Sequence, residues 1–257
     1  MIDCHAHLAA ADFDDDRPAV LERARAAGVE QVVVVGEDAA EARRVLEICA
    51  THGEMLRPCV GIHPDRFADD LPLPIDAELE AIETLARANH RHLAAIGEVG
   101  LDYWRVKDEE RRAAQRGCLE RMAALAAALD LPLNVHSRSA GHHTLSLLTG
   151  CGARRVLMHA FDGRASYAKR AAEEHGYFFS IPPSVVRSRQ KQKLVRALPL
   201  EVLALESDSP VLGPEPGQRN EPANLTRTVT TIAELKGVSE EQVRETTTAT
   251  ARRLFGR

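Results

Sequence analysis

The sequence of 257 residues lacks the features of several common protein classes. It has no apolar run near the roughly 20 residues that a membrane-spanning helix needs. Its first residues, Met1–His5, show no basic segment followed by an apolar one, as a secretory signal does. We therefore expect a cytoplasmic protein with no membrane association, and nothing in the sequence indicates an obligate protein partner.

An excess of positive charge and closely paired cysteines are also missing. The net charge of −5 gives no overall attraction to nucleic acid, although a local basic groove could still bind phosphates. The five cysteines are odd in number, widely spaced and free of any C-x-x-C pair, which is typical of a reducing compartment without a disulfide framework. No G-x-G-x-x-G motif follows the first apolar run, so the sequence lacks the motif that is typical of a dinucleotide-binding fold.

Short apolar runs alternate with longer segments of helical period along the whole chain. The eight runs that we predict as strands are Met1–His5, Gln31–Val35, Met55–Val60, Leu93–Gly97, Pro132–His136, Arg155–His159, Tyr177–Ile181 and Glu201–Leu205. Helices are predicted at Arg17–Ala27, Asp38–His52, Asp108–Leu129, Ser188–Leu198, Pro222–Lys236 and Ser239–Leu254, among other segments. Such alternation favours parallel βαβ units, and eight of them in 257 residues predict one domain, residues 1–257, folded as a TIM-type (β/α)₈ barrel.

Residues that bind metals follow several of the predicted strands. They are His5, His7, Glu98, His136, His159 and Asp208. A single histidine at a strand end is more often a hydrogen-bonded core residue, but six such residues are expected to meet at the carboxyl-terminal mouth of a barrel. His5 and His7 are two apart, so both side chains can face that mouth, with Cys4 turned toward the helices.

Imidazole and carboxylate ligands suit two divalent ions of the Zn, Mn, Fe, Co, Ni or Mg type better than Ca²⁺. Glu98 is predicted to bridge the ions, since one carboxylate can hold two ions about 3.5–4 Å apart. Asp208 is suited both to bind an ion and to accept the proton of an attacking water. We therefore predict Glu98 and Asp208 as the catalytic residues.

The segments around these residues resemble the motifs of the TatD family of metal-dependent deoxyribonucleases, which belongs to the metallo-dependent hydrolases. They occur in order along nearly the whole chain: Asp3-Cys4-His5-Ala6-His7-Leu8, Gly97-Glu98-Val99-Gly100-Leu101-Asp102, Asn134-Val135-His136-Ser137-Arg138, His159-Ala160-Phe161, Glu206-Ser207-Asp208-Ser209-Pro210 and Arg219-Asn220-Glu221-Pro222. The usual Glu-Thr-Asp of the family reads Glu-Ser-Asp here. Within the family, the segments 134–141, 159–163 and 176–188 are most similar to the third type of vertebrate TatD DNase domain-containing protein.

This resemblance implies cleavage of DNA phosphodiester bonds, often from the 3′ end. It also implies that His5, His7, Glu98 and Asp208 hold one ion, and that Glu98, His136 and His159 hold the second. His63 and Glu206 stand where some members recruit a third metal or contact substrate. A hydrogen-bond partner of a ligand and a buried strut are the alternative roles for these two residues.

Substrate contacts are predicted from charge and aromatic character. Arg138 can reach a phosphate near the ions, or it can pair with a carboxylate at the barrel mouth. The basic run from Arg187 through Arg189 to residue 193 suits a phosphate site at a helix start, or a solvated helix face. Tyr103 and Trp104 are candidates for stacking on a base of single-stranded DNA or a DNA end, and Trp104 alternatively packs at the rim.

Two other functions fit the same ligands. An amidohydrolase-type enzyme would use them to polarise the carbonyl group of a small ester, lactone or amide. A metal-binding scaffold without catalysis would not need Asp208 as a base. The basic run and Arg138 favour a phosphodiester substrate.

Overall fold

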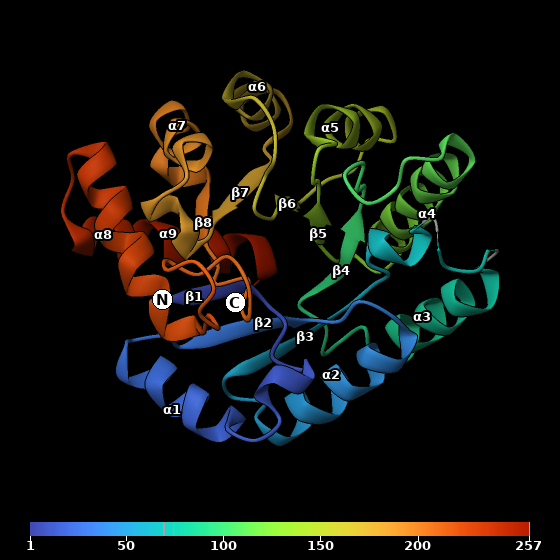
Figure 1. The fold of residues 1–257 in the computed structure, drawn as a ribbon, viewed down its shortest axis with the longest axis horizontal. Coiled ribbons are helices and arrows are strands. Elements are labelled where there is room, and N and C mark those ends of the chain that lie inside the picture. Colours follow the sequence, from blue (N-terminus) through green and yellow to red (C-terminus); the bar gives the residue numbers. More distant parts are fainter. Residues whose placement is uncertain (69, 74, 257) are drawn as a thin grey trace.

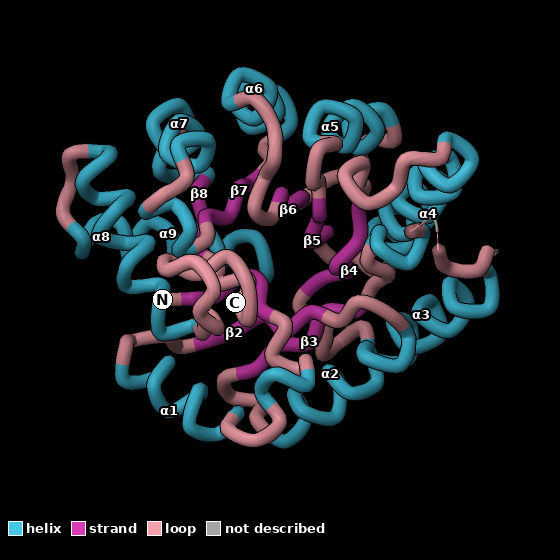
Figure 2. The backbone as a smooth tube through the Cα atoms, in the orientation of Figure 1, coloured by secondary structure: helices cyan, strands magenta, loops and turns pink. Residues whose placement is uncertain are grey.

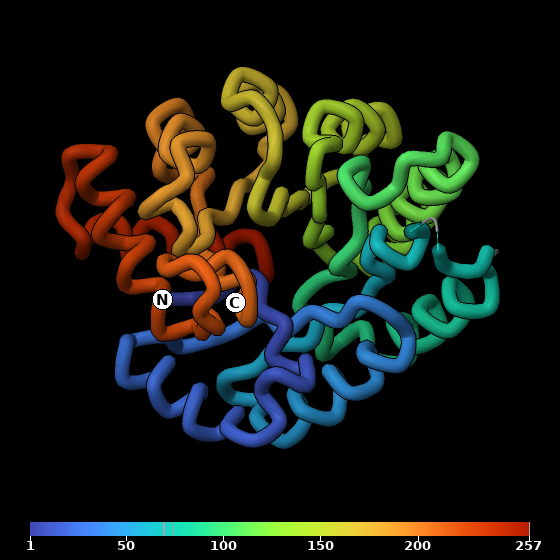
Figure 3. The backbone as a smooth tube through the Cα atoms, viewed as in Figure 1, coloured from blue at the N-terminus to red at the C-terminus, as the bar shows by residue number. Residues whose placement is uncertain are grey.

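The computed structural model describes residues 1–68, 70–73 and 75–256. Within them, eight parallel strands close into a barrel in chain order (Figures 1 and 3). The strands are β1 (Ile2–Ala6), β2 (Gln31–Val35), β3 (Leu56–Val60), β4 (Ala95–Gly100), β5 (Leu133–His136), β6 (Val156–Met158), β7 (Phe178–Ile181) and β8 (Leu203–Leu205). The predicted (β/α)₈ barrel is confirmed.

Helices form a ring outside the strands, as Figure 2 shows. They are α1 (Arg17–Ala26), α2 (Ala39–Thr51), α3 (Asp76–Asn89), α4 (Glu109–Ala128), α5 (Gly141–Gly150), α6 (Ala165–His175), α7 (Arg189–Ala197), α8 (Leu225–Lys236) and α9 (Glu240–Phe255). Several begin at a side-chain cap: Asp38, Asp108 and Ser188 each accept a hydrogen bond from a backbone N–H of the first turn. No helix in the described residues is long and apolar enough to cross a membrane.

The barrel has an inner apolar cluster as well as the larger one between strands and helices. Ile2, Cys4, Leu157 and Ala204 share the inner cluster with Leu254 of α9, although their strands β1 and β6 are not neighbours. Helix α9 therefore covers the amino-terminal end of the barrel, opposite the mouth. The expectation that Cys4 faces the helix ring is wrong.

Irregular strand pairing explains both the inward Cys4 and the position of the ligands. Asp3 pairs with Val32 and Ala6 with Val34, so β1 has one extra residue between two outward-facing positions. The pairing of β4 with β5 shifts in the same way between Ile96 and Val99. Such bulges re-aim side chains next to active sites. Here they allow both His5 and Glu98 to face the barrel mouth.

Candidate metal centre

The six predicted ligands lie together at the carboxyl-terminal mouth of the barrel, as expected. Five of them, His7, Glu98, His136, His159 and Asp208, line a cleft of about 550 Å³. The sixth, His5, is fully buried beneath the cleft.

One cluster forms around Oε2 of Glu98. The Nε2 atoms of His5 and His7 each lie 3.3 Å from this oxygen and 3.3 Å from each other. Oδ1 of Asp208 lies 3.6 Å and 3.5 Å from the same two nitrogens. Four tetrahedral ligands at about 2.0–2.1 Å from an ion are separated by about 3.3–3.4 Å. The atoms are therefore spaced as ligands of one ion would be.

A second cluster uses the other oxygen of Glu98. Oε1 lies 2.7 Å from Nδ1 of His136 and 2.9 Å from Nε2 of His159, and these two nitrogens are 3.4 Å apart. Glu98 thus presents one oxygen to each histidine pair. No described residue donates a hydrogen bond to the buried Oε2. A buried carboxylate oxygen without a hydrogen bond is stabilised by a neighbouring cation, so the side chains around Glu98 fit divalent metal ions.

His63 faces the same carboxylate but is prepared for a different role. Its Nε2 lies 3.5 Å from Oε1 of Glu98, whereas its Nδ1 accepts a hydrogen bond from the backbone N–H of Asp65 at 3.1 Å. Burial lowers the pKa of His63 to about 3, so the ring is neutral. A neutral imidazole that accepts at Nδ1 carries its proton on Nε2. This arrangement favours a hydrogen-bond donor over a ligand of a third ion.

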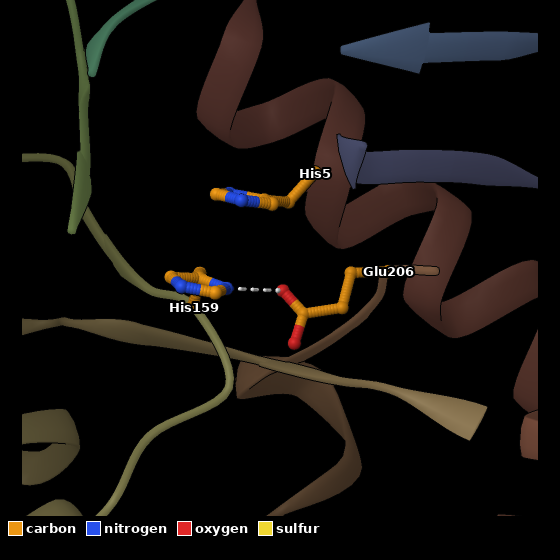
Figure 4. A group of neighbouring side chains, drawn as sticks. All are labelled: His5, His159 and Glu206. Atoms are coloured by element: carbon orange, nitrogen blue, oxygen red, sulfur yellow. Dashed lines mark ion pairs between the residues drawn. The ribbon is translucent and has the colours of Figure 1, made fainter. Parts of the chain in front are cut away.

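Glu206 lies behind His159 and is fully buried. Its Oε2 is 3.4 Å from Nδ1 of His159 and accepts a hydrogen bond from the Ser180 hydroxyl at 2.5 Å. Nε2, the other ring nitrogen of His159, faces Glu98. Figure 4 shows the Glu206 carboxylate directed at one edge of the His159 ring, with the ring of His5 stacked above. Carboxylates in this position orient metal-binding histidines and raise their basicity.

The other ligand histidines have similar partners, which sequence reasoning did not identify. His5 Nδ1 lies 2.9 Å from the amide oxygen of Asn134, whose nitrogen donates to the Cys4 carbonyl. His136 Nε2 lies 3.2 Å from Asp102, and His7 Nδ1 lies 3.8 Å from Glu37. Asn134 and Asp102 stand inside the family motifs, which is the signal that could have revealed them. Glu37 follows β2, where the sequence shows no such motif.

Opposite charges in the centre shift the pKa values of its members. Burial alone would lower the pKa of His159, but the carboxylates of Glu98 and Glu206 raise it to about 10. Burial is also opposed at His7, where Asp208 and Glu98 raise the pKa well above its usual range. Burial would raise the pKa of Glu98, but the positive charge of the histidines around it, His159 and His5 among them, and the hydrogen bond with His136 hold it well below normal. In the absence of metal ions, protons on His7 and His159 would therefore supply the positive charge that bound ions would otherwise supply.

The predicted substrate contacts separate into two groups. Arg138 and Arg187 line the cleft. The Arg138 guanidinium donates to Asp102 at 2.7 Å from Nε, and it stacks over the indole of Trp104 at 4.6 Å. Trp104 is 57% exposed, so its ring is accessible at the rim.

The structure places Tyr103 and Arg189 outside the cleft lining. The Tyr103 ring is buried and lies beneath Arg112 at 4.4 Å, and its hydroxyl accepts from Arg116 at 3.2 Å. Asp102 accepts hydrogen bonds from the backbone N–H groups of Trp104 and Arg105. This turn directs Tyr103 toward α4. Arg189 is exposed at the start of α7.

Comparisons with known proteins identify the family of the chain. The model of the family described as TatD related DNase matches residues 2–256. The chain belongs to the TatD family. It is 46% identical over 263 residues to human deoxyribonuclease TATDN3, covering 99% of this chain and 94% of the human protein. This similarity confirms the resemblance to the third vertebrate type.

More distant TatD relatives also match over their full length. A protein of Erwinia tasmaniensis named 3′-5′ ssDNA/RNA exonuclease TatD is 31% identical over 268 residues, covering 99% of each chain. The crystal structure of the TatD homologue YJJV from Escherichia coli superposes with a TM-score of 0.90 at 26% identity, covering 100% of this chain and 98% of that one. The barrel thus has the architecture of TatD proteins.

Proposed function

We propose that this chain, acting as one domain over residues 1–257, is a two-ion phosphodiesterase that removes nucleotides from the 3′ end of single-stranded DNA. The proposal rests on the position of the Glu98 carboxylate, whose two oxygens face different histidine pairs. The names of the human and Erwinia relatives, which describe nucleases, support a nucleic acid substrate.

His5, His7, Glu98 and Asp208 would hold one ion, and Glu98, His136 and His159 would hold the other. When bound, two divalent ions of the Zn, Mn, Fe, Co, Ni or Mg type supply positive charge for the phosphate and lower the pKa of a coordinated water. Asp208 accepts the proton of the attacking water at Oδ2, since Oδ1 is the oxygen near His5 and His7.

The remaining residues bind and orient the substrate. His63 lines the cleft, and its Nε2–H, 3.5 Å from Oε1 of Glu98, can donate to a phosphate oxygen bound there. Arg138 is held in place by Asp102 and Trp104, so its guanidinium can bind the neighbouring phosphate with little loss of rotamer entropy. Trp104 offers an exposed ring on which a base of a single strand can stack.

The reaction is tested with metal-loaded and chelator-treated protein on a 5′-labelled single-stranded oligonucleotide, its duplex, and a panel of esters, lactones and amides. We expect progressive shortening of the single strand from its 3′ end, lost after chelation. Turnover of a carbonyl substrate without DNA cleavage would instead support the amidohydrolase alternative.

A cytoplasmic location is also proposed, supported by five free cysteines, of which Cys4, Cys49, Cys59 and Cys118 are buried.

A further inference from the structure

Lys191 is a buried lysine in the wall of the cleft, although it belongs to a run of basic residues on α7. Its side chain donates hydrogen bonds to two consecutive carbonyl groups, those of Ala160 and of Phe161, the latter at 2.9 Å. It is only 8% exposed, whereas its neighbours Arg189 and Lys193 on the same helix are exposed. Burying an ammonium group is costly unless its hydrogen bonds are satisfied, so these contacts fix where Lys191 lies.

The carbonyls that Lys191 contacts directly follow the metal ligand His159. Ala160 has a φ of 37°, a left-handed conformation that is unfavourable for a residue with a side chain. On its other side, the Ala160 N–H donates to Oε1 of Glu206 at 2.8 Å. The strained residue is therefore held by an ammonium group through its carbonyl and by a carboxylate through its N–H.

The same carboxylate contacts His159 itself. Oε2 of Glu206 lies 3.4 Å from Nδ1 of His159, the edge visible in Figure 4. A change in the Ala160 backbone would therefore move the His159 ring and its nearest carboxylate together. In the described part of the chain, His7 and Asp208 of the first ion cluster make no hydrogen bond to Lys191 or Ala160, and His5 reaches them through its stacked contact with His159, so these ligands would be affected less.

We propose that Lys191 is a positioning residue for His159: with Glu206 it clamps Ala160, and so it sets the affinity of the ion held by His136 and His159. This inference rests on the proposed two-ion site. Its effect is selective, because one of the two ions depends on the clamp. Partners that orient metal-binding histidines typically change metal affinity about 10–100-fold when they are removed.

The test uses Lys191→Met in the full chain, which keeps the length of the side chain but removes its donors. Lys236→Met is the matched control, since the Lys236 ammonium likewise donates to a backbone carbonyl, that of Leu198, outside the cleft. Bound cobalt is measured by elemental analysis and visible absorption over a series of buffered free Co²⁺ concentrations. We expect Lys191→Met to bind the second ion about 10–100-fold more weakly and the first ion normally.

A second arm exploits the strain at Ala160. Glycine adopts the left-handed conformation without a steric cost, so the loss caused by Lys191→Met should be smaller in an Ala160→Gly background. If Lys191→Met does not fold, Lys191→Gln replaces it, since its amide can still donate, and an intermediate loss of the second ion is expected.

Three results would overturn the inference. One is unchanged affinity for both ions in Lys191→Met, and another is an equal weakening of both ions that Lys236→Met reproduces, which would indicate general destabilisation. The third is a wild-type protein that binds a single ion, which would overturn the two-ion proposal itself. DNA cleavage is not the readout, so a failure on DNA would leave the clamp standing.

Discussion

The rings of His5 and His159 stack in parallel, with centroids 3.8 Å apart and planes inclined by 7°. These two residues belong to different ligand clusters: His5 lies in β1 and His159 directly follows β6, and these two strands do not pair with each other. Glu98 joins the same two clusters through its carboxylate. The stacked rings and the shared carboxylate therefore hold the two ligand sets at a fixed separation.

Replacing Glu98 by alanine should remove metal and activity together. The substitution deletes both oxygens of the carboxylate, one facing each histidine pair, and leaves these pairs without their common counter-charge. We expect elemental analysis to show fewer than two ions per chain, and DNA hydrolysis to fall by at least about 100-fold, more than is usual for a residue that only orients a ligand. A variant that retains both ions would show that Glu98 is not the bridge.

Asp208→Asn separates chemistry from metal binding. Asparagine keeps an oxygen of similar size near His5 and His7 but lacks the basic carboxylate. Because a general base typically contributes about 10²–10⁴-fold, kcat on single-stranded DNA should fall by that order while KM changes little. Restoration of activity by excess metal would mean that Asp208 acts as a ligand alone, and its role as the base would then be withdrawn.

Arg138→Ala should weaken DNA binding with little effect on the chemical step. It removes one phosphate contact, so KM should rise, and the slope of log affinity against log salt should become shallower by about 0.7 for a single strand. Arg170→Ala on α6 is the control, because this arginine pairs with Glu174 outside the cleft. An unchanged salt slope in Arg138→Ala would leave only the ion pair with Asp102 as its role.

Much of this architecture was predictable because barrel strands and helices differ in period, and metal ligands differ in chemistry from core residues. The six ligands stood out as histidines and carboxylates at strand ends. Their supporting residues did not, since the pairing of Glu37 with His7 depends on how β1 and β2 lie beside each other. The inward turn of Cys4 depends on a bulge that no periodicity reveals.

The burial of Lys191 could have been predicted from its position in the helical period, but the surrounding basic residues made it look like part of an exposed charged face. It lies three and four residues before Leu194 and Val195, both buried, so helical period places it on the apolar face of α7. Within a run of basic residues, that position was indistinguishable from a solvated one. For Tyr103 the sequence was misleading in the other direction, because it suggested an accessible ring where the structure has a buried one. An aromatic residue after a ligand-bearing strand suggested base stacking, but the turn at Asp102 buries the Tyr103 ring.

Metal uptake should release protons, and metal affinity should fall as the pH is lowered. The pKa of His159 is raised to about 10 and that of His7 is raised well above its usual range, so both are protonated in the metal-free protein at neutral pH. Each must lose its proton to bind an ion. Affinity should therefore fall about tenfold per pH unit for each proton displaced. Calorimetric titration with Zn²⁺ in buffers of different ionisation enthalpy measures this, and a pH-independent affinity would contradict the shifts.

Gly97→Ala should destabilise the protein and disturb the site. Gly97 has a φ of 155°, and an added Cβ would lie 2.5 Å from the carbonyl oxygen of Asn134 and 2.8 Å from the Cβ of Asn134. Asn134 holds His5, and Glu98 follows Gly97 directly, so relief of this clash would displace ligands of both ions. We expect a loss of about 1–3 kcal/mol in the free energy of unfolding, together with weaker metal binding. Gly117→Ala is the matched control: this exposed glycine lies within α4 with nothing within 4 Å of the added Cβ, and alanine there should stabilise by about 0.4–1 kcal/mol. Urea denaturation of the metal-free variants gives both values, and a Gly97→Ala protein as stable as Gly117→Ala would show that β4 can shift away from β5 without cost.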